Sequence, residues 1–135
     1  MKQRGFPKSV RLLRTTDYRR VYAEGRRRNL EWLVAFSLAT GRSGSRVGLT
    51  VPTSVGGAVT RNRIKRRLRE AVRRNLGEIG PGWDIVLHPR AAAAALEFET
   101  IQQTVREFFR SCAASARRAG RSDTGETHDR KAQAT

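Results

Sequence analysis

One segment near the middle of this 135-residue chain restricts the possible folds more than any other. Between residues 58 and 76 the apolar side chains recur at helical spacing, which predicts a helix with one buried stripe. The rest of its surface is almost entirely basic, and Glu70 is the only acid between residues 61 and 74. The stripe consists of Ile64, Leu68, Ala71, Val72 and Leu76, and the cations are Arg61, Arg63, Lys65, Arg66, Arg67, Arg69, Arg73 and Arg74.

The charge of this segment indicates that its partner is RNA. Like charges one turn apart destabilise a helix, and about half a dozen such pairs cost roughly 2 kcal/mol. A polyanion would reverse that effect, and the whole chain carries a formal net charge of +16. Guanidinium groups bind phosphate through two hydrogen bonds, and Asn62 and the free N–H groups at the helix start add further contacts. A membrane partner is excluded because the core of the domain needs the apolar stripe.

The remaining segments predict a small mixed α/β domain in which helices cover one face of a sheet. Thr16 is expected to cap a short helix over residues 17–24, and Gly25 to end it. The other predicted elements are strands over residues 32–38, 46–51 and 84–87, and a long helix over residues 97–116. We expect a flexible basic arm (residues 1–10), one RNA-binding domain (residues 11–118) and a disordered tail (residues 119–135).

Aromatic residues lie beside basic ones in the first part of the chain. Tyr18 and Tyr22 are one helical turn apart and precede three consecutive arginines at positions 26–28. The bases of single-stranded nucleic acid stack on such rings. The pattern leaves open whether the two tyrosines bind bases or pack in the core, and it does not decide the role of Phe36. For Trp32 it favours the core.

The sequence has no recognisable catalytic constellation. Its histidines are His88, at the end of a predicted strand, and His128, in the tail. The acids are scattered, and no glycine-rich motif that binds phosphate is present. Cys112 is the only cysteine, which fits a reducing compartment, and nothing in the sequence directs export. We therefore expect a cytoplasmic protein with no active site and no metal site of its own.

Two neighbouring stretches, RVGLTV and GGAVTRNRIKRRLRE, closely resemble the signature of the bacterial ribonuclease P protein subunit. RLLRTTDYRRVYAEG and WDIVLHPRAA resemble the first helix and the last strand of that family. The resemblance implies an α+β fold with a small four-stranded sheet, in the order α-β-β-β-α-β-α. It also implies a left-handed crossover between the third and fourth strands, whereas spacing alone favours the usual right-handed one. The chain departs from the usual family pattern at Thr53, Ser54, Gly57 and Pro89.

The same resemblance implies a function. The protein would be the accessory subunit of an endoribonuclease whose catalytic RNA, with Mg²⁺ bound mainly by that RNA, removes the 5′ leader from precursor tRNA. The residues implied to contact the catalytic RNA are Arg61, Asn62, Arg63, Lys65, Arg66 and Arg69, and those implied to bind the leader are Tyr18, Tyr22 and Phe36. Two other interpretations are a ribosomal or other structural RNA-binding protein and a metal-dependent nuclease acting alone. The clustered carboxylates expected of such a nuclease are missing.

Overall fold

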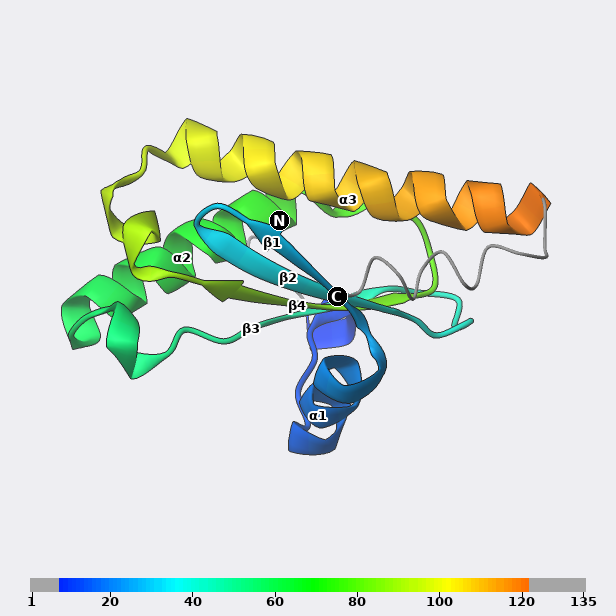
Figure 1. Ribbon diagram of the computed structural model, residues 1–135, viewed down its shortest axis with the longest axis horizontal. Coiled ribbons are helices and arrows are strands. Elements are labelled where there is room, and N and C mark those ends of the chain that lie inside the picture. The colour runs from blue at the N-terminus through cyan, green and yellow to red at the C-terminus, as the bar shows by residue number, and fades with distance from the viewer. Residues whose placement is uncertain (1–7, 122–135) are drawn as a thin grey trace.

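The computed structural model describes residues 8–121, and three helices and four strands follow one another in the expected order α-β-β-β-α-β-α (Figure 1). Residues 1–7 of the proposed arm (residues 1–10) and residues 122–135 of the proposed tail lie outside the described residues, and Lys8–Val10 form a short 3₁₀ helix. The elements are α1 (Thr15–Glu24), β1 (Arg26–Leu30), β2 (Leu33–Ala39), β3 (Arg46–Leu49), α2 (Ala58–Asn75), β4 (Trp83–Pro89) and α3 (Phe98–Arg121).

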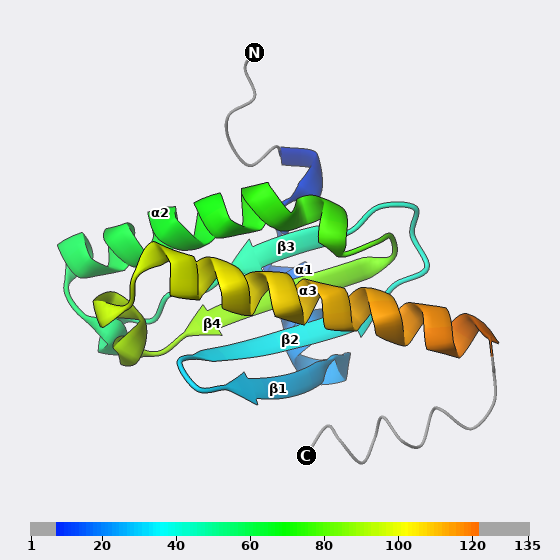
Figure 2. The same ribbon diagram turned by 90° about the horizontal axis from the view of Figure 1, so that it is seen from above.

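The four strands form one mixed sheet in the order β1-β2-β4-β3. β1 and β2 form an antiparallel hairpin, β4 pairs antiparallel with β2, and β3 pairs parallel with β4. Parallel neighbours need a crossover connection, and α2 supplies it. Seen from the side of α2 in Figure 2, the path from β3 through α2 to β4 turns in the left-handed sense. The crossover implied by the family resemblance is therefore confirmed, against the general preference for right-handed connections.

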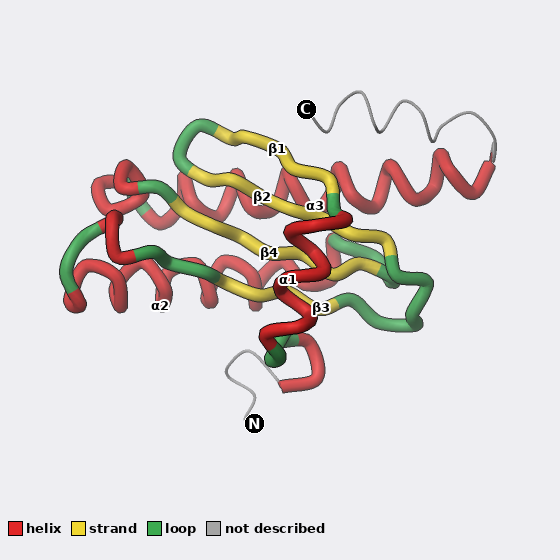
Figure 3. The backbone as a smooth tube through the Cα atoms, turned by 60° about the horizontal axis from the view of Figure 1, so that its bottom comes forward, coloured by secondary structure: helices red, strands yellow, loops and turns green. Residues whose placement is uncertain are grey.

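The helices cover both faces of the sheet, so the expectation that they share one face was wrong. α2 and α3 lie on one face and α1 lies across the other (Figures 1 and 3). The reason lies in the central strands, whose apolar residues alternate between the two faces. Ile85 and Leu87 of β4 belong to the core under α2 and α3, whereas Val86 packs with Val21 of α1. Because both faces of the sheet are apolar, helices must pack on both of them.

The stripe on α2 forms much of the larger core, as the helical spacing predicted. Ile64, Leu68, Ala71 and Val72 are all buried, and Leu76 is partly buried against the same cluster. The stripe lies beside α3, which contributes buried Ile101, Val105 and Phe109. Each such side chain contributes about 1.5–3 kcal/mol when fully buried. Within residues 8–121 no helix combines the length and the apolar character that crossing a bilayer requires.

Two local predictions failed. β1, with the sequence RRRNL, was not recognised from its residues, because a strand at the sheet edge with mostly exposed side chains has no apolar alternation. Thr16 does not cap α1, which begins at Thr15 with Arg14 in the capping position and no side-chain capping bond. Gly25 does end α1, and its N–H donates to the carbonyl oxygen of Val21 at 2.8 Å.

A buried ion pair fixes α1 over the sheet. Arg46 of β3 binds Asp84 of β4 through two hydrogen bonds, Nη2 to Oδ2 at 2.7 Å and Nε to Oδ1 at 3.0 Å. Its remaining nitrogen, Nη1, reaches Oδ2 of Asp17 on α1 at 3.4 Å. Asp84 is only 2% exposed, and a buried carboxylate needs such a partner. This guanidinium therefore ties two strands and α1 together.

Candidate nucleic-acid interface

All six residues that the resemblance assigns to RNA contact lie on the first two thirds of α2. We call this set, Arg61, Asn62, Arg63, Lys65, Arg66 and Arg69, the cationic face of α2. Asn62, Arg63, Arg66 and Arg69 are exposed and the other two are partly buried. Because Ile64 and Leu68 hold the opposite side of the helix in the core, these cations point outward together. Their forks can bind phosphate oxygens in pairs.

The first two thirds of α2 and its last third differ in whether their charge is neutralised. In the last third Glu70 accepts a hydrogen bond from Arg73 Nη2 at 2.6 Å and one from Arg74 Nε at 2.8 Å. These bonds, of which that from Arg73 has the larger effect, lower the pKa of Glu70 to about 2. Within residues 9–116, whose side chains the structure describes, no carboxylate forms an ion pair with any cation of the cationic face. The charge predicted for RNA binding is therefore available.

A groove on the opposite side of the sheet contains two of the three aromatic residues predicted to bind the leader. Tyr22 of α1 meets Phe36 of β2 edge to face, with ring centroids 4.8 Å apart. The Tyr22 hydroxyl donates to Oγ1 of Thr50 at 2.9 Å, which holds the ring in place. Tyr22 is 38% exposed, and both rings line a groove of about 410 Å³. A pair of fixed rings that faces an open groove suits stacking of bases.

Tyr18 has a different position from Tyr22, although the two are one turn apart. It is partly buried against the small core of Leu12, Val21 and Val86, and it is absent from the lining of the groove. Burial raises the pKa of its hydroxyl, and nearby Arg69 of the cationic face acts in the opposite direction. A Cβ on Gly48 would lie 2.5 Å from the Tyr18 hydroxyl oxygen. The glycine in RVGLTV thus makes room for the ring on the sheet.

Sequence reasoning missed the polar residues of the groove. Arg27 lies with its guanidinium carbon 6.0 Å from the centre of the Phe36 ring. Arg90 directly follows β4, and its Nη2 donates to Oδ1 of Asn29 at 3.0 Å. Recognition of β1 as a strand would have placed Arg27 on the face of Phe36, its pairing partner. Nothing in the local sequence indicates that Arg90 joins them.

The sequence analysis singled out Trp32 and His88, and the two residues lie in different surroundings. Trp32 is 5% exposed and belongs to the larger core, as the sequence favoured. His88 lines the groove, and burial, followed by the charges of Arg27 and Arg90, lowers its pKa. A neutral imidazole beside two arginines can offer hydrogen bonds but no additional charge.

The described residues contain no group of three or more His, Cys, Asp or Glu side chains that could hold a metal ion. Mg²⁺ prefers several oxygen ligands, usually carboxylates and waters. The residues present in this part of the chain therefore do not fit a Mg²⁺ site, and we assign no reaction step to a metal held by them. The arrangement offers cations, hydroxyls and rings, which can bind phosphates and bases.

The left-handed crossover, with the cationic face on its helix, places the protein in a distinct class of small basic α+β proteins. The chain is similar to known proteins of one name. The chain is 40% identical over 120 residues to a protein named Ribonuclease P protein component from Roseiflexus sp. (strain RS-1), covering 87% of this chain and 98% of that one. It is 35% identical over 106 residues to the protein of the same name from Clostridioides difficile (strain 630), covering 78% and 93%.

Solved structures agree with these relatives. The RNase P protein from Thermotoga maritima matches with a TM-score of 0.69 and 31% identity, over 75% of this chain and 96% of that chain. The protein from Staphylococcus aureus matches with a TM-score of 0.66 and 27% identity, over 74% and 92%. The model of the family described as Ribonuclease P matches residues 6–113. The chain therefore belongs to the ribonuclease P protein family, the protein components of a ribonuclease of tRNA processing.

Proposed function

We propose that this protein binds the catalytic RNA subunit of ribonuclease P and the 5′ leader of precursor tRNA, and so assists the RNA in removing that leader. The cationic face of α2 contacts phosphates of the catalytic RNA. The groove that contains Tyr22 and Phe36 holds bases of the single-stranded leader, with Tyr18 supporting α1 beside it. Hydrolysis of the phosphodiester and the Mg²⁺ that it requires belong to the RNA subunit, in the cytoplasm.

The observation that carries this proposal is the absence of acidic partners for the cationic face among the described residues. The chain contains acids that could neutralise it, and Glu70 on the same helix binds Arg73 and Arg74 instead. Five neighbouring cations without acidic partners oppose folding, because like charges on a helix repel one another. A phosphate backbone removes that repulsion and releases counterions.

The position of the groove adds a second line of support. α2 lies beside β3, an edge strand of the sheet (Figure 2), and Tyr18 of α1 packs on Gly48 of that same strand, so the cationic face and α1 meet at one edge of the sheet. A catalytic RNA bound along α2 can therefore guide the single-stranded leader around this edge of the sheet to the rings. The leader does not need to cross the domain. Phosphate contacts set position and the rings accept bases, a division common in RNA recognition.

The test is reconstitution with a ribonuclease P RNA and a precursor tRNA at low Mg²⁺. The protein should stimulate cleavage at the leader junction, and the variant R63Q/R66Q should stimulate it much less than R73Q/R74Q, which removes the same charge elsewhere on α2. Absence of stimulation would favour a ribosomal or other structural RNA-binding role. Cleavage by protein freed of RNA would instead identify a nuclease acting alone.

A further inference from the structure

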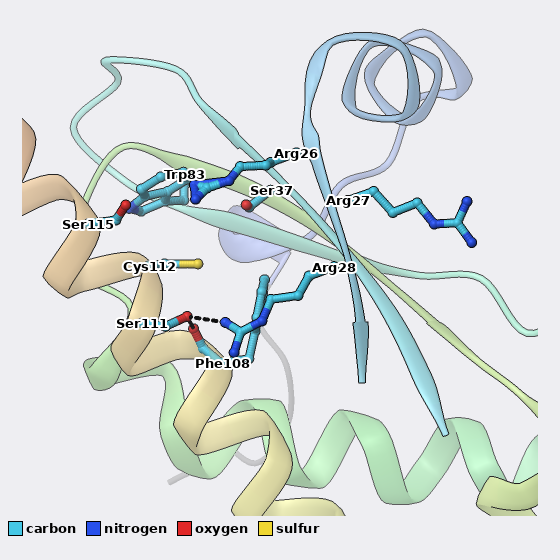
Figure 4. Close-up of a pocket in the computed structure, with 9 residues that line it drawn as sticks. All are labelled: Arg26, Arg27, Arg28, Ser37, Trp83, Phe108, Ser111, Cys112 and Ser115. Atoms are coloured by element: carbon cyan, nitrogen blue, oxygen red, sulfur yellow. Dashed lines mark hydrogen bonds between the residues drawn. The ribbon is translucent and has the colours of Figure 1, made fainter. Parts of the chain in front are cut away.

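A second hollow lies on the other face of the sheet, between the edge strand β1 and the C-terminal half of α3 (Figure 4). It has a volume of about 380 Å³, within the range of small-ligand pockets. Arg26 and Arg28 line it from β1, Trp83 from the start of β4, and Ser111 and Ser115 from α3. The proposed function uses none of these side chains.

The hollow is basic because of the alternation of β1. Side chains of a strand point to opposite faces in turn, so three consecutive arginines divide between two faces. Figure 4 shows the side chains of Arg26 and Arg28 extending towards α3, whereas the guanidinium of Arg27, which also lines the hollow, points away from it. Arg27 lies over Phe36 on the α1 side, in the groove already described. One edge strand thus carries cations to both faces of the sheet.

Two hydrogen bonds hold the Arg28 side chain in the hollow. Arg28 Nη1 donates to Oγ of Ser111 at 3.0 Å, and the Ser111 hydroxyl donates to the carbonyl oxygen of Phe108 at 2.7 Å. Burial raises the pKa of Cys112 to about 12, so its thiol adds no negative charge near neutral pH. No carboxylate lines the hollow in the described part of the chain. Among the described residues, an anion that enters the hollow therefore meets cations and no carboxylate.

We propose that this hollow binds one nucleotide of a single-stranded RNA, with its phosphate on Arg26, Arg28 and the Ser115 hydroxyl and its base against the Trp83 ring. Arginine forks bind phosphate in pairs, and an aromatic ring accepts any base. The strand reaches the hollow from the α1 groove by passing around the open edge of β1, where Arg27 meets its backbone. This inference rests on the proposed function in one respect, that the ligand of the groove is RNA.

The direct test is a change in the indole N–H signal of Trp83 in a two-dimensional NMR spectrum of the full chain. The protein has two tryptophans, so the variant W83F assigns the signal. Adenosine monophosphate, inorganic phosphate and a single-stranded oligoadenylate of about ten nucleotides are added in turn. The oligonucleotide should shift the signal most and the mononucleotide less. A Trp83 signal that no nucleotide moves would overturn the proposal.

Two variants separate the contribution of the arginine charges to binding from that of the shape of the hollow. R26Q/R28Q should weaken oligonucleotide binding roughly tenfold and lower its salt dependence, since the variant cannot form ion pairs with phosphate at these two positions. S115L keeps every charge but fills the hollow from α3, and it should weaken binding similarly. R73Q/R74Q is the control for removal of two positive charges. Equal binding by R26Q/R28Q, S115L and this control, with melting temperatures unchanged, would contradict the assignment.

Two further measurements identify the class of ligand and show which of the two proposals has failed. If an oligoglutamate peptide shifts Trp83 and RNA does not, the hollow binds an acidic protein segment and the proposal is wrong. Cleavage stimulation is measured separately in the reconstituted enzyme. If the protein stimulates cleavage but RNA does not shift the Trp83 signal, only the proposal for the hollow is refuted. If RNA shifts the Trp83 signal but the protein does not stimulate cleavage, only the proposed function is refuted.

Discussion

The cationic face of α2 and the groove beside α1 lie on different sides of the sheet and hold their side chains differently. The cations of α2 are long chains, and Arg63, Arg66 and Arg69 are exposed without an ion-pair partner among the described residues. The rings of the groove are fixed, since Tyr22 contacts both Phe36 and Thr50. Charge that is free to adapt suits an irregular polyanion, and rings that are held in place suit a defined base. The two regions should therefore respond differently to salt and to ligand.

The largest effect is expected from removing charge on the cationic face. R63Q/R66Q should weaken binding of the ribonuclease P RNA roughly 100-fold, because a hydrogen bond to a charged group is worth about 1.5–3 kcal/mol. The slope of log affinity against log salt should fall by about 0.7–0.9 for each phosphate that the variant no longer neutralises. Filter binding over a salt series measures both. An equal weakening in R73Q/R74Q would show that net charge alone matters and would remove the distinction between the two parts of α2.

Truncating a ring of the groove should give a smaller effect of another kind. Y22A should weaken binding of precursor tRNA by roughly 5- to 150-fold, since a stacked base is worth about 1–3 kcal/mol, and should leave mature tRNA unaffected. The salt slope should not change. Y22F is the matched control because it keeps the ring and removes only the bond to Thr50. If mature and precursor tRNA bound Y22A with equally reduced affinity, the ring would be a packing residue.

A methyl group under Tyr18 tests whether the groove is preformed. A Cβ at Gly48 would lie 2.5 Å from the hydroxyl oxygen and 2.6 Å from the ring carbon that bears it. G48A should therefore push α1 off the sheet and destabilise the protein by about 1–3 kcal/mol, as overpacking does. G44A is the control, since its Cβ would meet nothing within 4 Å. Urea unfolding should also show that Y18A relieves much of the G48A defect; simple additivity of the two destabilisations would argue against this contact.

The smallest effect concerns Glu70, whose neighbours on α2 give it a pKa of about 2 against an ordinary value of 4.5. A lowered folded-state pKa stabilises the fold above pH 4.5, and this contribution is lost as the pH falls towards 2. Because the side chain is 36% exposed, solvent screens both ion pairs, and E70Q should cost about 0.5–1 kcal/mol at pH 7. Thermal unfolding of both proteins should converge over that acidic range.

E70Q also tests the role of charge on α2 by leaving more of its positive charge unpaired, whereas R63Q/R66Q removes positive charge. It releases Arg73 and Arg74 from their only acidic partner among the described residues and so lengthens the charged surface of α2. RNA binding by E70Q should become more dependent on salt than binding by the parent protein. An unchanged salt slope would mean that RNA does not reach the last third of the helix.

The parts of the fold that the sequence predicted are those set by local spacing. The stripe from Ile64 to Val72 is buried as the helical period requires, and the length of α2 follows from it. β1 could not be predicted in this way, because Arg26–Leu30 becomes a strand only by pairing with Leu33–Ala39. The position of α1 opposite α2 depends on both faces of β4 being apolar, a property of the assembled sheet rather than of any one segment.

The candidate interface was predictable to a similar extent. The cations of α2 lie on one helix, so their common surface follows from the sequence. The groove combines Tyr22, Phe36, His88 and Arg90, which are far apart in the chain and meet only through the strand order. The family resemblance placed Tyr22 and Phe36 near one another, but only the folded chain adds His88 and Arg90 to them. The roles of all these residues in RNA binding stay predictions.

The strand order also has a consequence for the timing of folding. β4 lies between β2 and β3, yet it is the last strand in the chain. A ribosome must therefore release residues 83–89 before β2 and β3, which are synthesised earlier, can pair with β4. Until then the β1–β2 hairpin and β3 have exposed backbone edges, which are prone to pair wrongly. A nascent chain of this protein should therefore become resistant to protease late and abruptly, once β4 and the core residues of α3 have left the exit tunnel.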